Sequence, residues 1–169
     1  RRTSAADNVQ LLGGQLRGAA VNNDRMITGR GTVFVNSLIN SGSIAAVGGT
    51  LLINTVTDNI DLDGPGTSGR LNAVQGDLTI ADLPTDPFDG QAFVGFGRTL
   101  TLAEGWFVGT SGTIELGGAP GNPATVAGSA QVIDGNVVVS GPARFALGTL
   151  FMGTSDVFTS AAGDSLELT

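Results

Sequence analysis

A short acidic segment holds the residues of this chain best suited to chemistry. Asp58, Asp61 and Asp63 lie close together, and Asp61-Leu-Asp63-Gly64 has the alternating carboxylates with which calcium loops begin. A hard cation such as calcium prefers oxygen ligands of this kind. The complete loop pattern is not present, because Asn72 stands where a closing Glu is required. We hypothesise a calcium site at Asp58, Asp61 and Asp63, with an acidic turn as the alternative.

A second candidate contact is aromatic. Trp106 is the only Trp of the chain, and it opens the bulky cluster Trp106-Phe107-Val108. An indole ring can stack on a sugar, so Trp106 is a candidate ligand contact. Phe107 and Val108 continue an apolar run, however, and this favours the interpretation that Trp106 fills the interior of a wide coil.

The residue types that are missing exclude most catalytic machinery. The chain has no Cys and no His, and its eight basic residues are all Arg. A Ser-His-Asp triad, a Cys-His pair, a Lys Schiff base and a zinc site built on His or Cys are therefore excluded. Carboxylate chemistry on a glycosidic bond remains available. Glu115 alternates with Ile114 and Leu116 and should face solvent, and Asp82, Asp86 and Asp89 form a separate acidic group around two prolines. No pairing is evident, so we predict no enzyme, no catalytic residue and no organic cofactor.

Charge and hydropathy limit the partners. The formal net charge is −7 and the isoelectric point is about 4.2. Phosphate backbones and anionic membrane surfaces both require a basic patch, so neither is an expected partner. No apolar run approaches the ~20 residues that cross a bilayer, and direct membrane insertion is not expected.

A short sequence phrase that recurs along the chain predicts the β-strands that would position these residues. A turn residue precedes an apolar–polar–apolar strand, as in Gly31-Thr-Val-Phe-Val35 and Gly49-Thr-Leu-Leu-Ile53. Seven such phrases begin at Thr32, Thr50, Asp77, Thr99, Thr113, Asn136 and Asp164, so they recur irregularly, roughly every twenty residues. Repeats of this length are typical of solenoids, in which each unit buries its apolar face against a neighbour.

We predict a single right-handed parallel β-helix, or β-solenoid, over residues 1–169, with helix close to absent. Glycine and proline interrupt every candidate helical stretch, while Gly and Asn supply the corners. An antiparallel β-sandwich is the alternative, because Asp134-Gly135 between two good strands is a hairpin candidate. In the best coil, residues 31–54, the expected inward side chains are Val33, Val35, Leu38, Ile44 and Leu51. We expect the apolar positions of the phrases to mix inward and outward directions, with at least one of them fully buried in each phrase.

The phrase SLINSGSIAAVGGTLLIN of residues 37–54 resembles the degenerate repeats of β-helical passenger regions in bacterial autotransporters and related large adhesins. The likeness extends loosely over the whole chain, as in Asn136-Val-Val-Val-Ser-Gly141. It implies an extracellular location on the bacterial outer surface or in secreted form. It brings no catalytic signature with it.

The predicted function is a structural or adhesive stalk segment of a much longer bacterial cell-surface or secreted repeat protein. The first alternative is a β-helical carbohydrate-active enzyme or phage tailspike-type fragment that uses Asp and Glu carboxylates. The second is an ice-binding solenoid, because Thr32, Thr50, Thr99 and Thr113 open several phrases. Expected partners are neighbouring repeats of the same chain, host or matrix glycans or proteins, and further copies through uncapped terminal coils.

Overall fold

The computed structural model describes residues 3–4, 8–56, 59–64, 69–103, 105–153 and 157–169. All the regular elements in these ranges are β-strands, as the sequence predicted. They are β1 (Thr3–Ser4), β2 (Val9–Asn23), β3 (Met26–Asn40), β4 (Ser43–Thr55), β5 (Ile60–Asp61), β6 (Arg70–Gln75), β7 (Leu78–Ile80), β8 (Gln91–Val94), β9 (Thr99–Leu102), β10 (Trp106–Val108), β11 (Thr113–Leu116), β12 (Ala124–Ile133), β13 (Asn136–Val139), β14 (Pro142–Met152), β15 (Val157–Ser160) and β16 (Ser165–Leu168).

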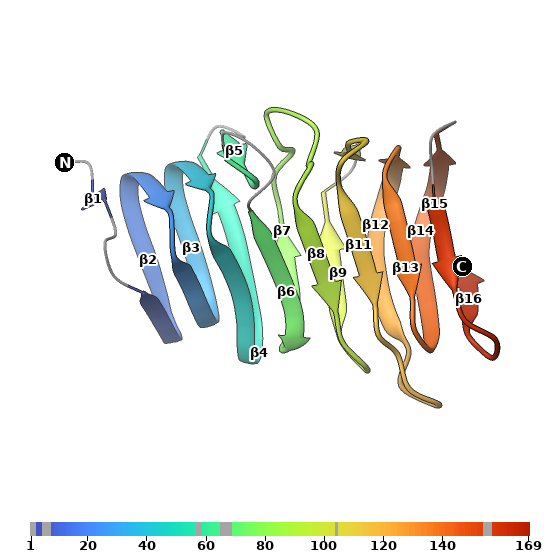
Figure 1. Ribbon diagram of the computed structural model, residues 1–169. Coiled ribbons are helices and arrows are strands. Elements are labelled where there is room, and N and C mark those ends of the chain that lie inside the picture. Colours follow the sequence, from blue (N-terminus) through green and yellow to red (C-terminus); the bar gives the residue numbers. More distant parts are fainter. Residues whose placement is uncertain (1–2, 5–7, 57–58, 65–68, 104, 154–156) are drawn as a thin grey trace.

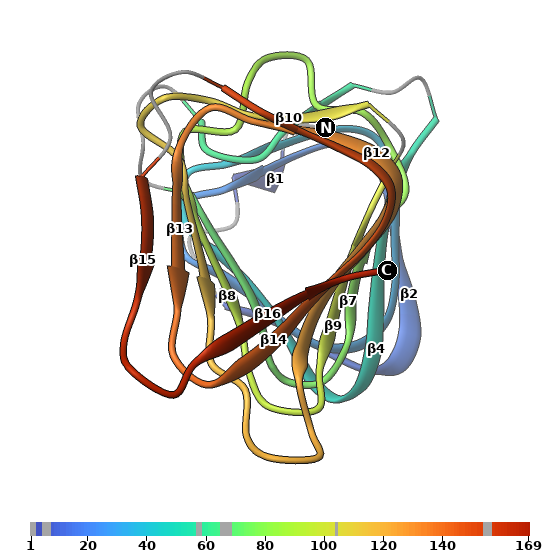
Figure 2. The same cartoon turned by 90° about the vertical axis from the view of Figure 1, so that its right-hand side faces the viewer.

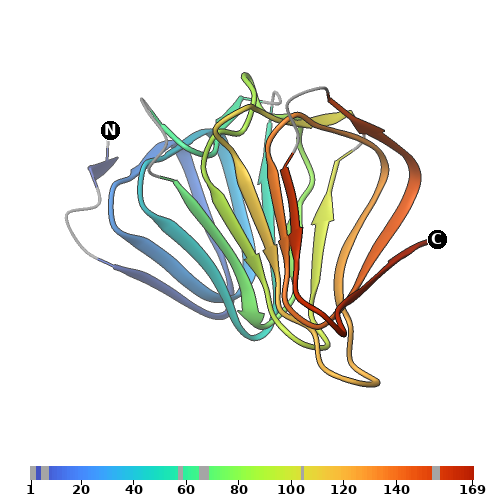
Figure 3. The same cartoon turned by 45° about the vertical axis from the view of Figure 1, so that its right-hand side comes forward.

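These strands wind into a β-solenoid of about seven turns, whose coils are stacked side by side (Figures 1 and 3). Every pairing between named strands is parallel. Seen from its C-terminal end, the chain turns anticlockwise as it approaches the viewer, so the coil is right-handed (Figure 2). The parallel β-helix prediction is confirmed.

Each coil contributes strands to three stacks, which we call faces 1, 2 and 3. Face 1 contains β6, β8, β11, β13 and β15, together with the first parts of β2, β3 and β4. Face 2 contains β7, β9 and β16, the later part of β4, the middle of β2 and β3, and the first parts of β12 and β14. Face 3 contains β1, β5 and β10 with the last parts of β2, β3, β12 and β14. Long strands such as β3 therefore bend around corners.

Apolar side chains from equivalent strands form continuous columns inside the coil. On face 1 one column is at most 1% exposed throughout; it consists of Ile27, Ile44, Leu71, Ala92, Ile114 and Val137. Because successive side chains of a strand point to opposite sides, the residues between these positions face outward. Parallel pairing in register then places apolar side chains above apolar side chains, which gives the coil an apolar core.

The facing of the phrases is more uniform than the sequence indicated. The five residues expected inward between 31 and 54 are all buried, which confirms that assignment. The expectation that the apolar positions mix directions is wrong, because all ten are at most 3% exposed. The two apolar positions of a phrase are two residues apart and so share one side of the strand. The ten are Val33, Val35, Leu51, Ile53, Leu78, Ile80, Leu100, Leu102, Ile114 and Leu116.

Buried asparagines bind one corner of neighbouring coils together. Asn23 Nδ2 donates to Asn40 Oδ1 at 2.6 Å and to the Ser43 carbonyl at 3.0 Å. Asn40 Nδ2 continues the ladder to the Leu62 carbonyl at 2.9 Å. Buried polar groups require such partners, and here each amide satisfies the backbone of the next coil.

A glycine at another corner allows two coils to approach closely. Gly31 has a φ of 124°, and a Cβ there would lie 2.2 Å from the Gly14 carbonyl oxygen. Only glycine combines this backbone conformation with that contact. The turn residue that opens the phrase is therefore needed for coil stacking as well as for the corner.

The hairpin candidate at Asp134-Gly135 is wrong. β12 and β13, which flank this dipeptide, do not pair with each other: β12 pairs with β9, β10 and β14, and β13 pairs with β11 and β15. The chain turns a corner there and passes from face 3 to face 1. The sandwich alternative fails with it, since the pairing among named strands is parallel.

The uneven spacing of the phrase also has a structural explanation. The phrases at Thr32, Thr50, Asp77 and Thr99 lie on face 2. The intervals from Thr50 to Asp77 and from Asp77 to Thr99 are each one coil, whereas the register partner of Thr32 in the next coil is Leu52, two residues beyond Thr50. Thr113, which begins β11, belongs to face 1. The interval from Thr99 to Thr113, the shortest of the series, is therefore only part of a coil.

Candidate functional site

Three carboxylates from two successive coils gather at one corner of the solenoid. Asp61 ends β5, Asp63 follows two positions later, and Asp86 belongs to the segment between β7 and β8 one coil further on. The two segments are joined by a parallel bridge between Ile60 and Pro84. The backbone N–H of Thr85 also donates to the Ile60 carbonyl at 2.8 Å. This pairing of irregular segments brings Asp86 to the other two.

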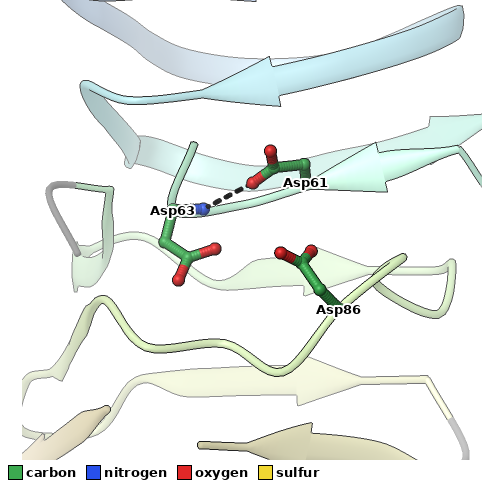
Figure 4. A group of neighbouring side chains, drawn as sticks. All are labelled: Asp61, Asp63 and Asp86. Atoms are coloured by element: carbon green, nitrogen blue, oxygen red, sulfur yellow. Dashed lines mark hydrogen bonds between the residues drawn. The ribbon is translucent and has the colours of Figure 1, made fainter. Parts of the chain in front are cut away.

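The three side chains converge, as Figure 4 shows. One carboxylate oxygen from each of Asp61, Asp63 and Asp86 can be chosen so that all three lie within 4.8 Å of one another. Asp61 Oδ1 accepts the backbone N–H groups of Asp63 at 3.2 Å and Gly64 at 2.6 Å, which fixes its orientation. Asp63 Oδ2 accepts the Asp89 N–H at 2.7 Å.

Asp63 has an unusual electrostatic environment. It is 3% exposed, and its burial raises the pKa of its carboxyl group from 3.8 to about 6. The hydrogen bond from the Asp89 N–H acts in the opposite direction, and the negative charges of Asp86 and Asp61 raise the pKa further. At neutral pH this corner therefore concentrates negative charge against a desolvated carboxylate.

Such an arrangement has two chemical uses. Carboxylate oxygens that meet at one point are suitable ligands for a hard divalent cation such as calcium, which would also relieve the repulsion among them. Without a cation, the site takes up a proton close to neutral pH, because protonation removes the buried charge. Calcium binding remains a prediction at this corner.

The sequence anticipated part of this cluster. Asp61 and Asp63 lie together as expected, whereas Asp58 lies outside the described residues. Asp86 was assigned to a separate acidic group, and its proximity to Asp61 was missed. The signal that could have found it is the separation of Asp61 and Asp86 along the chain, which matches the length of one coil.

The other members of that acidic group do not join the cluster. Asp82 accepts the backbone N–H of Thr55 through Oδ2, and Asp89 Oδ1 accepts the N–H of Ser111 at 2.9 Å. Asn72, at the position where a calcium loop would require Glu, lies on β6 and donates to Ser43 Oγ at 2.8 Å. These side chains hold neighbouring coils together.

Trp106 lies inside the coil. It is 0% exposed, and its ring centroid is 5.2 Å from that of Phe88. The interpretation that this residue fills the interior is confirmed, and the indole is not accessible for stacking on a sugar. Its Nε1 and the nearby Gln131 Oε1 have no hydrogen-bond partner among the described residues.

A shallow groove on the outside of face 1 was not anticipated by the sequence. It crosses β3, β4 and β6, and its lining includes Met26, Val47 and Val74. These three apolar side chains are exposed. The three side chains point outward from their strands. The repeated phrase predicts only the inward-facing positions, so it gives no information about this groove.

The threonines that open several phrases do not stack in a single column. Thr32 is in register with Gln15 and Leu52, while Thr113 is in register with Gln91 and Asn136. A flat threonine array therefore does not form from these residues.

No protein-family model, curated protein or solved structure matches this chain. The described residues include no helix of the length and apolar character required to cross a membrane. The evidence for the β-solenoid fold is therefore the structure alone.

Proposed function

We propose that this chain is a non-catalytic structural segment, a stalk that extends and presents the corners of its coils. The observation that carries the proposal is the use of carboxylates as clamps between coils. Five Asp side chains accept backbone N–H groups 22 to 27 positions away, about one coil along the chain. They are Asp63 (from Asp89), Asp77 (from Thr99), Asp82 (from Thr55), Asp89 (from Ser111) and Asp164 (from Gly141).

These clamps give five of the fifteen acidic residues of the chain a structural use. A carboxylate that accepts backbone N–H groups at a corner replaces hydrogen bonds that a strand would otherwise make. Because the clamps are distributed over several coils, they connect successive coils instead of converging on a substrate. Such a distribution supports the stalk, whereas catalysis on a sugar would require carboxylates paired across one accessible cleft.

A carbohydrate-active enzyme is the second candidate, and the cluster at Asp61, Asp63 and Asp86 is what favours it. A carboxylic acid with a pKa of about 6 is the type of group that serves as a general acid near neutral pH. Asp63 is buried and bound to the Asp89 N–H, however, so its access to a glycosidic bond is poor. This argues for a structural role of the cluster.

The location and the partners follow from the same proposal. The likeness of residues 37–54 to autotransporter and adhesin repeats supports a bacterial outer-surface or secreted protein, with host or matrix glycans or proteins as ligands. A chain without Cys is compatible with export in an unfolded state. The exposed corners and the outer sides of the three faces are the surfaces available for adhesion.

The experiment combines a turnover assay with an adhesion assay. The purified chain, Asp63→Asn and Asp86→Asn are incubated with a panel of neutral and acidic polysaccharides, and released reducing ends are measured. The proposal expects no release by any of the three proteins. Beads coated with the chain should nevertheless be retained on immobilised glycans or matrix proteins. Polysaccharide cleavage that Asp86→Asn abolishes would promote the enzyme and overturn the stalk.

A further inference from the structure

The groove on the outer side of face 1 lies on coils that have neighbouring coils on both sides. It crosses the first parts of β3 and β4 together with β6, and its volume is about 350 Å³. This size is at the lower end of the range for small-molecule sites. Met26, Val47 and Val74 give the groove an apolar lining, and Asn72 and Gln75 add amide groups. It can therefore accept a ligand that has both apolar and hydrogen-bonding surfaces.

The strand segments around the groove are positively charged, although the whole chain is acidic. These segments are residues 26–30, 43–47, 70–75 and 91–94. They contain two Arg and no Asp or Glu. Arg30 Nη1 donates to the Gly48 carbonyl at 3.2 Å, beside Val47 of the groove. Arg70 is exposed, and its guanidinium makes no hydrogen bond or ion pair with the described residues. An anionic ligand would meet complementary charge on this surface.

The nearest acidic residues do not pair with Arg70. Asp77 lies on face 2, where it accepts the Thr99 N–H. Glu115 is the first carboxylate further along face 1, and β8 separates it from Arg70. The acidic corner lies just before β6 in the chain, but the charged neighbours that raise the pKa of Asp63 are Asp86 and Asp61, not Arg70. The guanidinium is thus available to a ligand.

An aromatic ring lies beside Arg70 on the same surface. β8 follows β6 in the stack, with Gln91 in register with Arg70 and Phe93 in register with Asn72 (Figure 1). Phe93 alternates with buried residues of β8, so it points outward. It is half-buried, which leaves part of its ring accessible. The groove, the guanidinium and the aromatic ring therefore follow one another along the side of the solenoid.

This combination suits an acidic glycan. A sugar ring has an apolar face that can stack on an aromatic ring, and its hydroxyl groups can bond to amides. The carboxylate or sulfate of an acidic sugar can form charge-assisted hydrogen bonds with a guanidinium. An extended peptide is less suitable, because the strands under this surface are paired on both sides and offer no edge for main-chain hydrogen bonds. A lipid chain would stay largely exposed in a shallow groove.

We propose that the outer side of face 1, from the groove to Phe93, binds an acidic glycan whose anionic group pairs with Arg70. The proposal narrows the ligand class of the proposed stalk and so rests on that function. A glycan bound there would lie along the side of the solenoid and cross several coils.

Biolayer interferometry on the full 169-residue chain tests the proposal with matched polymers. Polygalacturonate and its fully methyl-esterified form share a backbone and differ in charge. Dextran sulfate and dextran form a second pair, which distinguishes a sulfated ligand from a carboxylated one. At least one charged polymer should bind about tenfold or more tightly than its neutral counterpart, and added salt should reduce the difference. Equal binding within both pairs, or binding to none of the polymers, would overturn the proposal.

Substitutions on the surface locate the contact. Arg70→Gln should weaken binding to the charged polymer about tenfold, because it removes charge-assisted hydrogen bonds. Phe93→Thr should weaken it about threefold or more through the loss of stacking. Arg17→Gln is the matched control, because it removes the same charge from face 2, where Arg17 lies over the ring of Phe34. An equal loss in Arg17→Gln would indicate unspecific attraction to charge and would contradict the proposal.

Two opposite charges at one position separate binding from folding. Val47→Asp and Val47→Lys both place a charged side chain in the groove, at a position that is 37% exposed. Their effects on folding should therefore be similar, and circular dichroism checks this. Binding to the charged polymer should be lost in Val47→Asp and retained in Val47→Lys. Equal affinity of the two variants would place the ligand elsewhere and refute the proposal.

Failure of this proposal can be told from failure of the stalk. Beads coated with Arg70→Gln that are retained on glycans or matrix proteins as well as wild-type beads would refute the site on face 1 and leave the stalk in place. Cleavage of a polysaccharide would overturn the stalk whether or not the substitutions on face 1 change binding.

Discussion

Replacing Asp63 by Asn should stabilise the fold at neutral pH. Burial holds the pKa of this carboxyl group at about 6 in the folded protein, against an ordinary value of 3.8. The folded state therefore binds the proton more tightly than the unfolded chain does. Above pH 6 the buried carboxylate destabilises the fold in full, and this cost disappears as the pH falls toward 3.8 and the folded protein takes up its proton.

The size of the effect follows from the pKa difference. Two pKa units correspond to about 3 kcal/mol, at about 1.36 kcal/mol per unit. An asparagine side chain at this position would keep an oxygen to accept the Asp89 N–H, but a neutral acceptor gives a weaker hydrogen bond, worth about 1 kcal/mol less. We expect a net gain of about 1–3 kcal/mol above pH 6, which shrinks steadily below it.

Urea unfolding followed by far-UV circular dichroism measures the difference between variant and wild type across this pH range, in buffer with a chelator. Asp77→Asn is the matched control, since Asp77 accepts the Thr99 N–H at 2.9 Å and lies outside the cluster. It should show no such gain. A loss of stability in Asp63→Asn above pH 6, or a difference that does not vary with pH, would refute the electrostatic reasoning.

Three other perturbations test the core, the asparagine ladder and the acidic corner. Leu100→Ala should lower the free energy of unfolding by ~2–5 kcal/mol, because Leu100 lies in a column between Leu78 and Val126 that cannot close around the cavity. The control is Thr101→Ala, on the opposite side of the same strand, whose free energy of unfolding should stay within about 0.5 kcal/mol of wild type. Asn40→Ala should cost about 1–3 kcal/mol in the same urea assay, because it leaves the Leu62 carbonyl without its amide donor; an unchanged midpoint would show that the ladder contributes nothing. Calcium should stabilise the fold by a free energy that grows as RT ln(1 + [L]/Kd), and so raise the thermal midpoint. Asp86→Asn should remove this effect. A thermal midpoint unchanged by millimolar calcium would eliminate the metal site.

Much of the local structure could be predicted because the information is carried by neighbouring residues. Alternation of apolar and polar side chains fixes which residues of a strand share a side, and Gly, Asn and Pro prevent helix between strands. The candidate site was only half predictable. Asp61 and Asp63 are close in sequence, whereas Asp86 reaches them through the bridge between Ile60 and Pro84, which belongs to two different coils.

By itself the sequence determined the strand phrase, its buried positions and the need for each coil to stack on another. The tertiary structure decided which face a phrase occupies, because the length of a coil varies. Ile27, Ile44 and Leu71 are successive members of one column, yet the chain between the first two is much shorter than the chain between the last two. Corners absorb this variation without disturbing the core, so no local pattern records it. For the same reason Asp134-Gly135 forms a corner and not a hairpin. β13, which follows this dipeptide, pairs with β11 and β15 and so continues columns of the core that a hairpin would interrupt.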